Sequence, residues 1–275
     1  MTSPKLAFPL RGRGRHYPYP PQDPSGWPRN QWGSVNPDDV PVEVVPSVTN
    51  VLSVCDKPGL KGWAAEQALR SLYESGHIPL DVERAIQSHK WAFNDVSERR
   101  ADAGTRAHTL AERLTQDLPL PSSISEEDEA YADAFLKFWS DTNPEPLEVE
   151  VTMYGDGYAG TADLIANLTV NFSRGPRVVD YKTRGERPDP KKKARYGLLY
   201  DENRMQLAAL AHCPQVALEG SEGWELLPAP QVEGAVGVAL YPDGTYDLEE
   251  VADLDRWYRG FRGALKLWKG LRGVA

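Results

Sequence analysis

The segment Val178-Val-Asp-Tyr-Lys-Thr183 places a carboxylate and an ammonium group two residues apart in an apolar setting. On a strand, residues two apart share a face, so Asp180 and Lys182 project together while Tyr181 points to the other side. Burying either charge is costly unless it has a partner. The pair therefore indicates either a site that uses both charges or a salt bridge on an exposed edge strand. The apolar residues around it favour a site.

A second carboxylate, Asp163, lies in Gly160-Thr-Ala-Asp-Leu-Ile165, among residues typical of a buried strand. A hairpin over residues 147–168 would bring Glu150, or Glu148, to the same end of the sheet. Two or three carboxylates in register are what a hard divalent cation such as Mg²⁺ or Mn²⁺ needs. A lysine beside that ion can orient an attacking water or stabilise charge that develops on a phosphate.

His108 is a further candidate ligand. In Gly104-Thr-Arg-Ala-His-Thr-Leu-Ala-Glu112 it stands four residues before Glu112, so the imidazole and the carboxylate share one face of a predicted helix. The His-Glu-x-x-His order of zinc proteases is absent. A histidine at this spacing is more often structural than a ligand, and the spacing alone does not choose between the two.

Two kinds of periodicity show which elements must position these residues. Up to about residue 145, hydrophobic residues recur with helical spacing, which predicts helices over 60–75, 81–93, 95–117 and 126–141. Later, alternation with period two predicts strands over 147–152, 158–170, 177–183, 235–241 and 245–250, with helices over 198–212 and 253–272. This order predicts an α/β (α+β) protein in which helices flank a central mixed sheet.

The N-terminal segment, residues 1–45, differs from the rest of the chain. It is rich in Pro, Gly and aromatic residues and is predicted to be extended. Residues 46–275 are predicted to form a single domain. Its helical part covers about 46–145 and its sheet core about 146–275.

Composition excludes several classes of protein. The 275 residues are 40% hydrophobic and 26% charged, as in ordinary globular proteins. Two cysteines are too few for a disulfide framework or an iron–sulfur cluster. The longest apolar run, residues 235–240, falls far short of the roughly 20 residues of a membrane helix, and no signal peptide is apparent. A cytoplasmic protein without membrane association is expected.

The net charge of −9 is unevenly distributed. Residues 121–163 hold eleven acidic residues and one lysine, whereas residues 177–204 hold nine basic and five acidic ones. Residues 1–32 and 253–275 each carry a net charge of +4. Adjoining acidic and basic blocks suit a site in which carboxylates hold cations while nearby Lys and Arg receive phosphates.

The candidate residues occur in an order that resembles a known family. His108, Glu150, Gly160-Thr-Ala-Asp163, Asp180-Tyr-Lys182-Thr and Gln206 follow one another as in the RecB-like branch of the PD-(D/E)XK nuclease superfamily. More narrowly, Pro46-Ser-Val-Thr-Asn-Val-Leu and Lys57-Pro-Gly-Leu-Lys-Gly-Trp63 look like phage-encoded exonucleases related to the CRISPR-associated adaptation nuclease. The resemblance runs from about residue 46 to 212. It implies a restriction-endonuclease-like core.

The resemblance also implies a role for each residue. Asp163 and Asp180 would ligate the metal ion, with the backbone carbonyl of Tyr181 and with His108. Lys182 would position or activate the water, Gln206 would hold Lys182 or the phosphate, and Glu150 would support the metal ion. The implied cofactor is Mg²⁺ or Mn²⁺. The cysteine quartet of some relatives is missing, so no iron–sulfur cluster is expected.

A run of basic residues after the third strand is predicted to grip DNA phosphates beside the metal ion. It consists of Arg184, Arg187, Lys191, Lys192, Lys193 and Arg195. Tyr196 is a candidate for stacking on a base. The resemblance implies linear DNA, or DNA with free ends, as the partner, and a single-strand annealing or recombination protein as a second candidate partner.

The leading interpretation is a metal-dependent DNA exonuclease of phage recombination, repair or replication, located in the host cytoplasm. One alternative is an endonuclease of the same fold that cuts flapped or branched DNA. Another is a non-catalytic DNA-binding accessory protein of recombination. The intact set of Asp163, Asp180 and Lys182 argues against this last alternative, because a protein that only binds DNA could lose any of the three.

Overall fold

A seven-stranded mixed sheet forms the centre of the computed structural model. The structure describes residues 6–55, 58–76, 81–121, 123–185, 198–221 and 223–273, without the side chains of 58–60. In sheet order the strands are β10 (Tyr246–Glu250), β9 (Gly234–Leu240), β6 (Ser173–Thr183), β5 (Tyr158–Val170), β4 (Glu145–Gly155), β7 (Gln215–Gly220) and β8 (Gly223–Pro228). Neighbours are antiparallel except β6 and β9, which are parallel. Strand β6 is therefore an inner strand.

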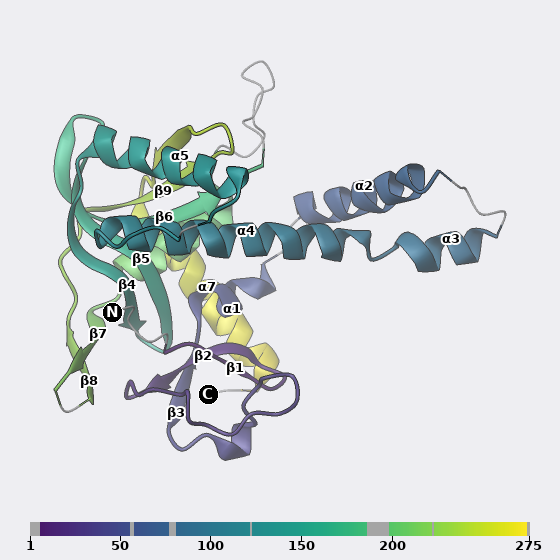
Figure 1. The fold of residues 1–275 in the computed structure, drawn as a ribbon. Coiled ribbons are helices and arrows are strands. Elements are labelled where there is room, and N and C mark those ends of the chain that lie inside the picture. The colour runs from purple at the N-terminus through teal and green to yellow at the C-terminus, as the bar shows by residue number, and fades with distance from the viewer. Residues whose placement is uncertain are drawn as a thin grey trace.

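Helices cover both faces of this sheet (Figure 1). One face packs against α4 (Ala92–Thr115) and α5 (Glu126–Thr142), whose Tyr131, Phe135 and Phe138 are buried as the helical spacing predicts. The other face packs against α1 (Val48–Val51), α6 (Asp201–Ala211) and α7 (Leu254–Arg272). The predicted fold class is confirmed: helices flank a mixed sheet, consistent with a restriction-endonuclease-like core.

A helical arm projects from this body (Figure 1). It consists of α2 (Pro58–Glu74), α3 (Val82–His89) and the first half of α4. Asp81 caps α3 by accepting hydrogen bonds from the backbone amides of Glu83 and Arg84. Within the described ranges, none of the helices has the length and the apolar character needed to cross a bilayer.

A small antiparallel sheet precedes the arm in the chain. Its strands are β1 (Phe8–Leu10), β2 (Gly14–Tyr19) and β3 (Glu43–Pro46). The 3-10 helix η1 (Pro37–Asp39) lies between β2 and β3, and a second 3-10 helix, η2 (Leu52–Val54), follows α1. Tyr17 and Val45 pack against Tyr154 and Ala159 of the large sheet. The extended N-terminal segment of the sequence analysis is thus folded into strands, which the period-two pattern did not reveal because prolines interrupt it. The hairpin of β7 and β8 was missed for a similar reason, since glycines and prolines bound its short strands.

Gly237 of β9 occupies a position where a side chain does not fit. It pairs with Asp180 of β6, and an added Cβ would stand 2.4–3.0 Å from the buried side chain of Leu199. We expect Gly237→Ala to lower the free energy of unfolding by about 1–3 kcal/mol, because a packed interior yields little. Gly263 of α7 is the control, since its added Cβ meets nothing within 4 Å and alanine favours helices. Urea denaturation compares the variants, and equal losses of stability would contradict this packing argument.

Candidate active site

The two central strands separate at one end of the large sheet, and the candidate residues lie there. The paired positions of β5 and β6 run from Val170 and Ser173 to Leu164 and Val179. The next residues are Asp163 and Asp180. Here the backbone amide of Tyr181 donates a hydrogen bond of 2.7 Å to Oδ2 of Asp163 instead of to a strand carbonyl. The carboxylate of Asp163 thus accepts the hydrogen bond from the backbone amide of Tyr181, at the point where the pairing of β5 and β6 ends.

Strand β4 is distorted at the position opposite Asp163. Val149 pairs with Leu164 and Val151 with Ala162, and Glu150 lies between these pairs. Its φ of 49° is left-handed, a conformation that costs free energy in a residue other than glycine. Such strain persists where the surrounding structure enforces it, and it often marks functional sites. Glu148 is half-buried, and burial raises the pKa of its carboxyl group.

Helix α4 brings a histidine to the same place. Small residues of this helix, Ala107 and Ala111, are buried against the sheet and let the helix approach it closely. Nδ1 of His108 lies 3.4 Å from Oδ1 of Asp163. Ligand atoms of His108, Glu150 and Asp163 all lie within 4.8 Å of one another, and these residues could hold a metal ion. Glu112 does not belong to this group. The sequence left open whether Glu148 or Glu150 joins it, and the structure brings Glu150 to it.

Asp180 and Lys182 form an ion pair beside this group. Nζ of Lys182 lies 2.6 Å from Oδ2 of Asp180, and Nε2 of Gln206 donates a 3.0 Å hydrogen bond to Oδ1 of the same carboxylate. In the described structure Gln206 therefore contacts Asp180, and its predicted role in holding Lys182 or the phosphate stays a prediction. Asp180 is only 3% exposed, and within the described residues its Oδ2 accepts no hydrogen bond of normal geometry despite the nearby ammonium group. Asp180 is not part of the group of three around Asp163. The salt bridge exists, but on an inner strand and not on an exposed edge.

The pKa shifts show strong electrostatic interaction among the side chains of the site. The carboxylate of Asp163 raises the pKa of His108 to about 9, against the effect of burial. Burial and then Asp163 raise the pKa of Asp180. Burial alone would lower the pKa of Lys182, but Asp180 and Asp163 outweigh it and the net shift is upward. For the acid Asp163, burial alone would raise the pKa, but His108, Lys182 and the backbone amide of Tyr181 lower it, and the net shift is downward. The acidic and basic groups of the site therefore act on one another's protonation.

Of the remaining site residues predicted from the sequence, the structure describes Tyr181 and Arg184. Arg184 donates a 2.9 Å hydrogen bond to the carbonyl of Leu198, and its guanidinium lies 5.2 Å from the ring centre of Tyr200. Tyr181, whose carbonyl the family resemblance assigns to the metal ion, buries its ring between α5 and the sheet. The other DNA-binding candidates, Arg187, Lys191, Lys192, Lys193, Arg195 and Tyr196, lie outside the described residues.

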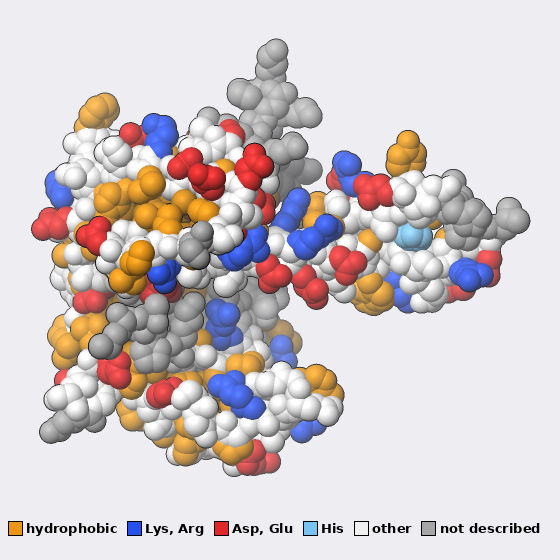
Figure 2. Space-filling model, in the orientation of Figure 1, with side chains coloured by type: hydrophobic (Ala, Val, Ile, Leu, Met, Phe, Trp, Pro, Cys, Tyr) orange, Lys and Arg blue, Asp and Glu red, His pale blue; other side chains and the backbone are white. Residues whose placement is uncertain are grey.

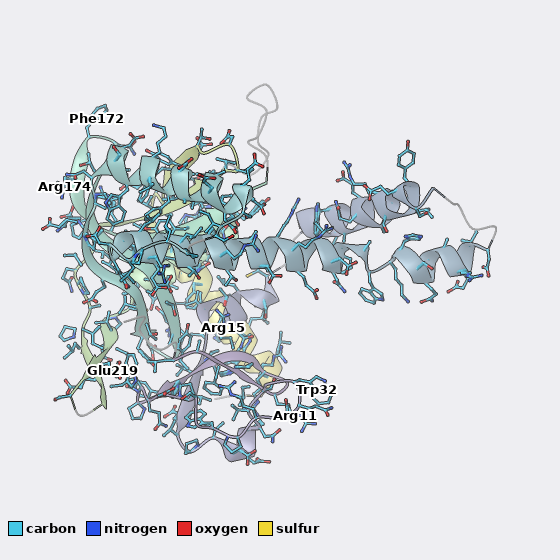
Figure 3. The ribbon with its side chains drawn as sticks, in the orientation of Figure 1. Arg11, Arg15, Trp32, Phe172, Arg174 and Glu219 are labelled. Carbon is cyan, nitrogen blue, oxygen red and sulfur yellow. The ribbon has the colours of Figure 1, made fainter. Side chains whose placement is uncertain are left out.

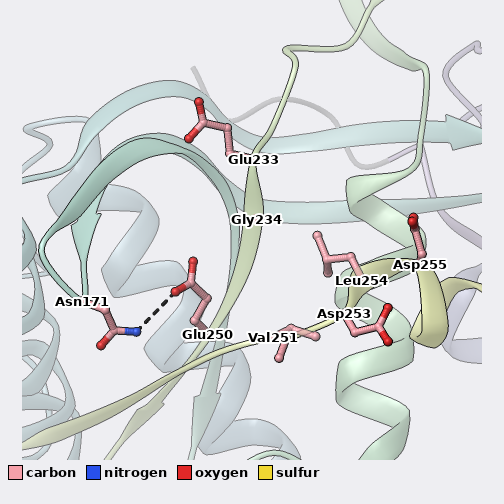
Figure 4. Close-up of a pocket in the computed structure, with 9 residues that line it drawn as sticks. Asn171, Glu233, Gly234, Glu250, Val251, Asp253, Leu254 and Asp255 are labelled. Atoms are coloured by element: carbon pink, nitrogen blue, oxygen red, sulfur yellow. Dashed lines mark hydrogen bonds between the residues drawn. The ribbon is translucent and has the colours of Figure 1, made fainter.

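A separate cavity of about 490 Å³ lies near the other end of β6 (Figure 4). Four acidic residues, Glu233, Glu250, Asp253 and Asp255, line it together with Asn171. Glu250 is already engaged, because it accepts hydrogen bonds from Arg177 at 2.9 Å and from Asn171 at 3.3 Å. This cavity is distinct from the group around Asp163.

Comparison with known proteins does not assign this chain to a family. The sequence matches no model of a known protein family, and no curated protein matches it. Among solved structures, SSO0001 is similar over 60% of this chain and 72% of its own, with 15% identity and a TM-score of 0.26. An alkaline exonuclease, LHK-Exo from Laribacter hongkongensis, is similar over 61% of this chain and 81% of its own, with 13% identity and a TM-score of 0.28. Likenesses this weak carry no weight, so the site is interpreted from its own residues.

Proposed function

We propose that this protein is a metal-dependent DNA exonuclease that hydrolyses phosphodiester bonds with metal-activated water. The observation that carries the proposal is the convergence of His108, Glu150 and Asp163 within 4.8 Å, beside the ion pair of Asp180 and Lys182. Metal-assisted hydrolysis of a phosphodiester needs a set of carboxylate ligands and a cation close to the reacting phosphate. These five residues supply both.

The residues present fit a hard divalent cation. In an octahedral site, ligand atoms about 2.1 Å from the ion stand about 3 Å apart when adjacent and about 4.2 Å apart when opposite. The ligand atoms of His108, Glu150 and Asp163 lie within 4.8 Å of one another, so they would have to move only slightly closer together to bind an ion. The carboxylate of Asp180 adds negative charge beside this group, and its Oδ2 is in contact with Nζ of Lys182 at 2.6 Å. Carboxylate oxygens suit Mg²⁺ and Mn²⁺, and one imidazole among them shifts the preference toward Mn²⁺.

Each side chain has a distinct task in this proposal. A divalent ion held by His108, Glu150 and Asp163 would lower the pKa of a bound water and offset charge on the phosphate. Gln206 fixes Asp180, and Asp180 in turn holds the ammonium group of Lys182 at the edge of the site. From there Lys182 can donate hydrogen bonds to the attacking water or to a phosphate oxygen.

DNA as the substrate follows from the distribution of basic residues and from the resemblance given by the sequence. Arg184 follows directly on β6, next to the candidate active site. Phosphate contacts from basic residues hold DNA regardless of its sequence. The role in phage recombination, repair or replication, and a single-strand annealing or recombination protein as partner, rest on the resemblance alone.

The test uses end-labelled linear DNA and covalently closed circular DNA of the same sequence, with Mg²⁺, Mn²⁺ or EDTA. We expect linear DNA to be degraded from its ends with either ion, Mn²⁺ acting at lower concentration than Mg²⁺, and EDTA to stop the reaction. Nicking of the closed circle would replace the exonuclease by an endonuclease. Binding without cleavage under every condition would instead favour the accessory protein and refute the proposed chemistry.

A further inference from the structure

Two segments far apart in the chain form one basic surface outside the candidate active site. The first is the β1–β2 turn, with Arg11, Arg13 and Arg15, and the second is the end of α7, with Lys266, Lys269 and Arg272. We call this set the hairpin surface. Residues 6–22 and 263–273 contain no acidic residue, in a chain whose net charge is −9.

We propose that the hairpin surface binds the phosphate backbone of duplex DNA and holds the substrate while its end occupies the candidate active site. This inference rests on the proposed function, because it assigns to that function a second contact with the same DNA. No sequence pattern assigned Arg11, Arg13 or Arg15 to a site. The feature of the sequence that could have indicated this surface is the alternation of arginine and glycine over residues 11–15, in a segment of positive charge.

Contacts without an acidic partner hold the two halves of the hairpin surface together. Nη1 of Arg272 donates a 3.1 Å hydrogen bond to the carbonyl of Gly12. His16, which is buried, packs beside Trp268 with 5.9 Å between the ring centres. Burial lowers the pKa of His16, and the charges of Arg13 and Arg272 lower it further, which shows how close the two segments lie. The charges of Arg13 and Arg272 repel one another at this distance, and a phosphate bound between them would offset that repulsion.

The backbone of the turn is fixed and its arginine side chains are exposed. Nδ2 of Asn50 donates hydrogen bonds to the carbonyls of Arg13 and Arg15, at 2.6 and 3.2 Å. Gly14, with a φ of 81°, has no space for a side chain, since a Cβ would stand 2.7 Å from Oδ1 of Asn50. Within the described residues, neither Arg13 nor Arg15 pairs with an acidic side chain. The turn therefore presents unpaired positive charge on a rigid frame, the arrangement that phosphate binding requires.

The hairpin surface lies at a distance from the candidate site that a short duplex spans. The amide of Ser47 donates to the carbonyl of Arg15, and Ser47 pairs with Ala159 of β5. Asp163 follows four residues further along β5, about 13 Å away at 3.3 Å per residue. This separation along the strand corresponds to about four base pairs at 3.4 Å each. Figure 3 shows Arg15 at the small sheet, and Figure 2 shows Lys and Arg side chains over this lower part of the molecule.

The experiment compares two double variants that lose the same charge. Arg13→Gln/Arg15→Gln changes the hairpin surface, and Lys137→Gln/Arg174→Gln changes exposed residues of α5 and β6 as the control. Arg174 lies far from Arg15 in Figure 3. Fluorescence anisotropy in EDTA measures the binding of a 30-base-pair duplex and of one of its strands over a range of salt concentrations. Hydrolysis of the p-nitrophenyl ester of thymidine 5′-phosphate with Mn²⁺ reports on the candidate active site alone.

We expect the hairpin variant to bind the duplex about tenfold more weakly, with the slope of log Kd against log salt reduced by about two. The control should bind the duplex as the unchanged protein does. Both variants should hydrolyse the short ester at the same rate as the unchanged protein. Unchanged affinity and slope in the hairpin variant, or a loss confined to the single strand, would overturn the inference while leaving the proposed function intact. An equal loss of ester hydrolysis in the hairpin variant would also overturn it. If the unchanged protein neither bound nor cleaved DNA, the proposed function itself would fail.

Discussion

Asp163→Asn is expected to lower DNA cleavage by about a thousandfold or more while leaving the fold intact. Asparagine has the size of aspartate, and its amide oxygen can accept the hydrogen bond that the amide of Tyr181 now donates to Oδ2. The negative charge is lost, and with it the attraction for a cation shared with His108 and Glu150. Initial rates on end-labelled linear DNA measure the effect.

Thermal unfolding provides a second readout that does not depend on activity. An ion that binds only the folded protein stabilises it by about 2.7 kcal/mol at a hundred times its dissociation constant. The unchanged protein should therefore melt at a higher temperature with Mn²⁺ than with EDTA, and the Asp163→Asn variant should show almost no difference. Asp156→Asn is the matched control, because this exposed aspartate pairs with Arg262 at the turn between β4 and β5. A variant at Asp163 that kept both the Mn²⁺ shift and the cleavage rate would disprove the assignment.

Short-range patterns made part of the candidate site predictable. The side chains of Asp180 and Lys182 share a face because strand residues two apart always do, whatever the rest of the chain adopts. The apolar residues around them correctly indicated burial, since Asp180 is 3% exposed. The sequence could not show that β6 is an inner strand. Its partner β9 lies more than fifty residues later, and their parallel pairing depends on the intervening elements.

Long-range geometry decided the rest of the site. Period two gives Glu148 and Glu150 the same face, so their pattern could not separate them. A shift in the register of β4 between Pro146 and Glu148, and the left-handed backbone at Glu150, distinguish the two in the structure. Helical spacing likewise predicted Glu112 as the neighbour of His108. In the structure the packing of α4 on the sheet places His108 next to Asp163. Such contacts arise from tertiary structure, which overrides local spacing.

Lys182→Met is expected to lower the rate of DNA cleavage by about a hundredfold to ten-thousandfold without weakening the binding of Mn²⁺. The ammonium group stands beside the three candidate ligands and not among them. Its loss should therefore affect the reacting water or phosphate more than the ion. This outcome differs from that of Asp163→Asn, in which Mn²⁺ binding and cleavage disappear together. Calorimetric titration with Mn²⁺ and initial cleavage rates separate the two.

The same ion pair could instead serve stability alone, and a second variant decides between these roles. Removing one partner of a buried pair commonly costs about 3–5 kcal/mol, so Lys182→Met can weaken the fold as well as the chemistry. Lys182→Arg keeps the positive charge beside Asp180 but replaces a compact ammonium group by a larger planar fork. We expect this variant to match the unchanged protein in urea denaturation and in Mn²⁺ binding, and still to cleave DNA slowly. If Lys182→Arg folded, bound Mn²⁺ and cleaved at the full rate, the charge of Lys182 would be needed only to balance Asp180.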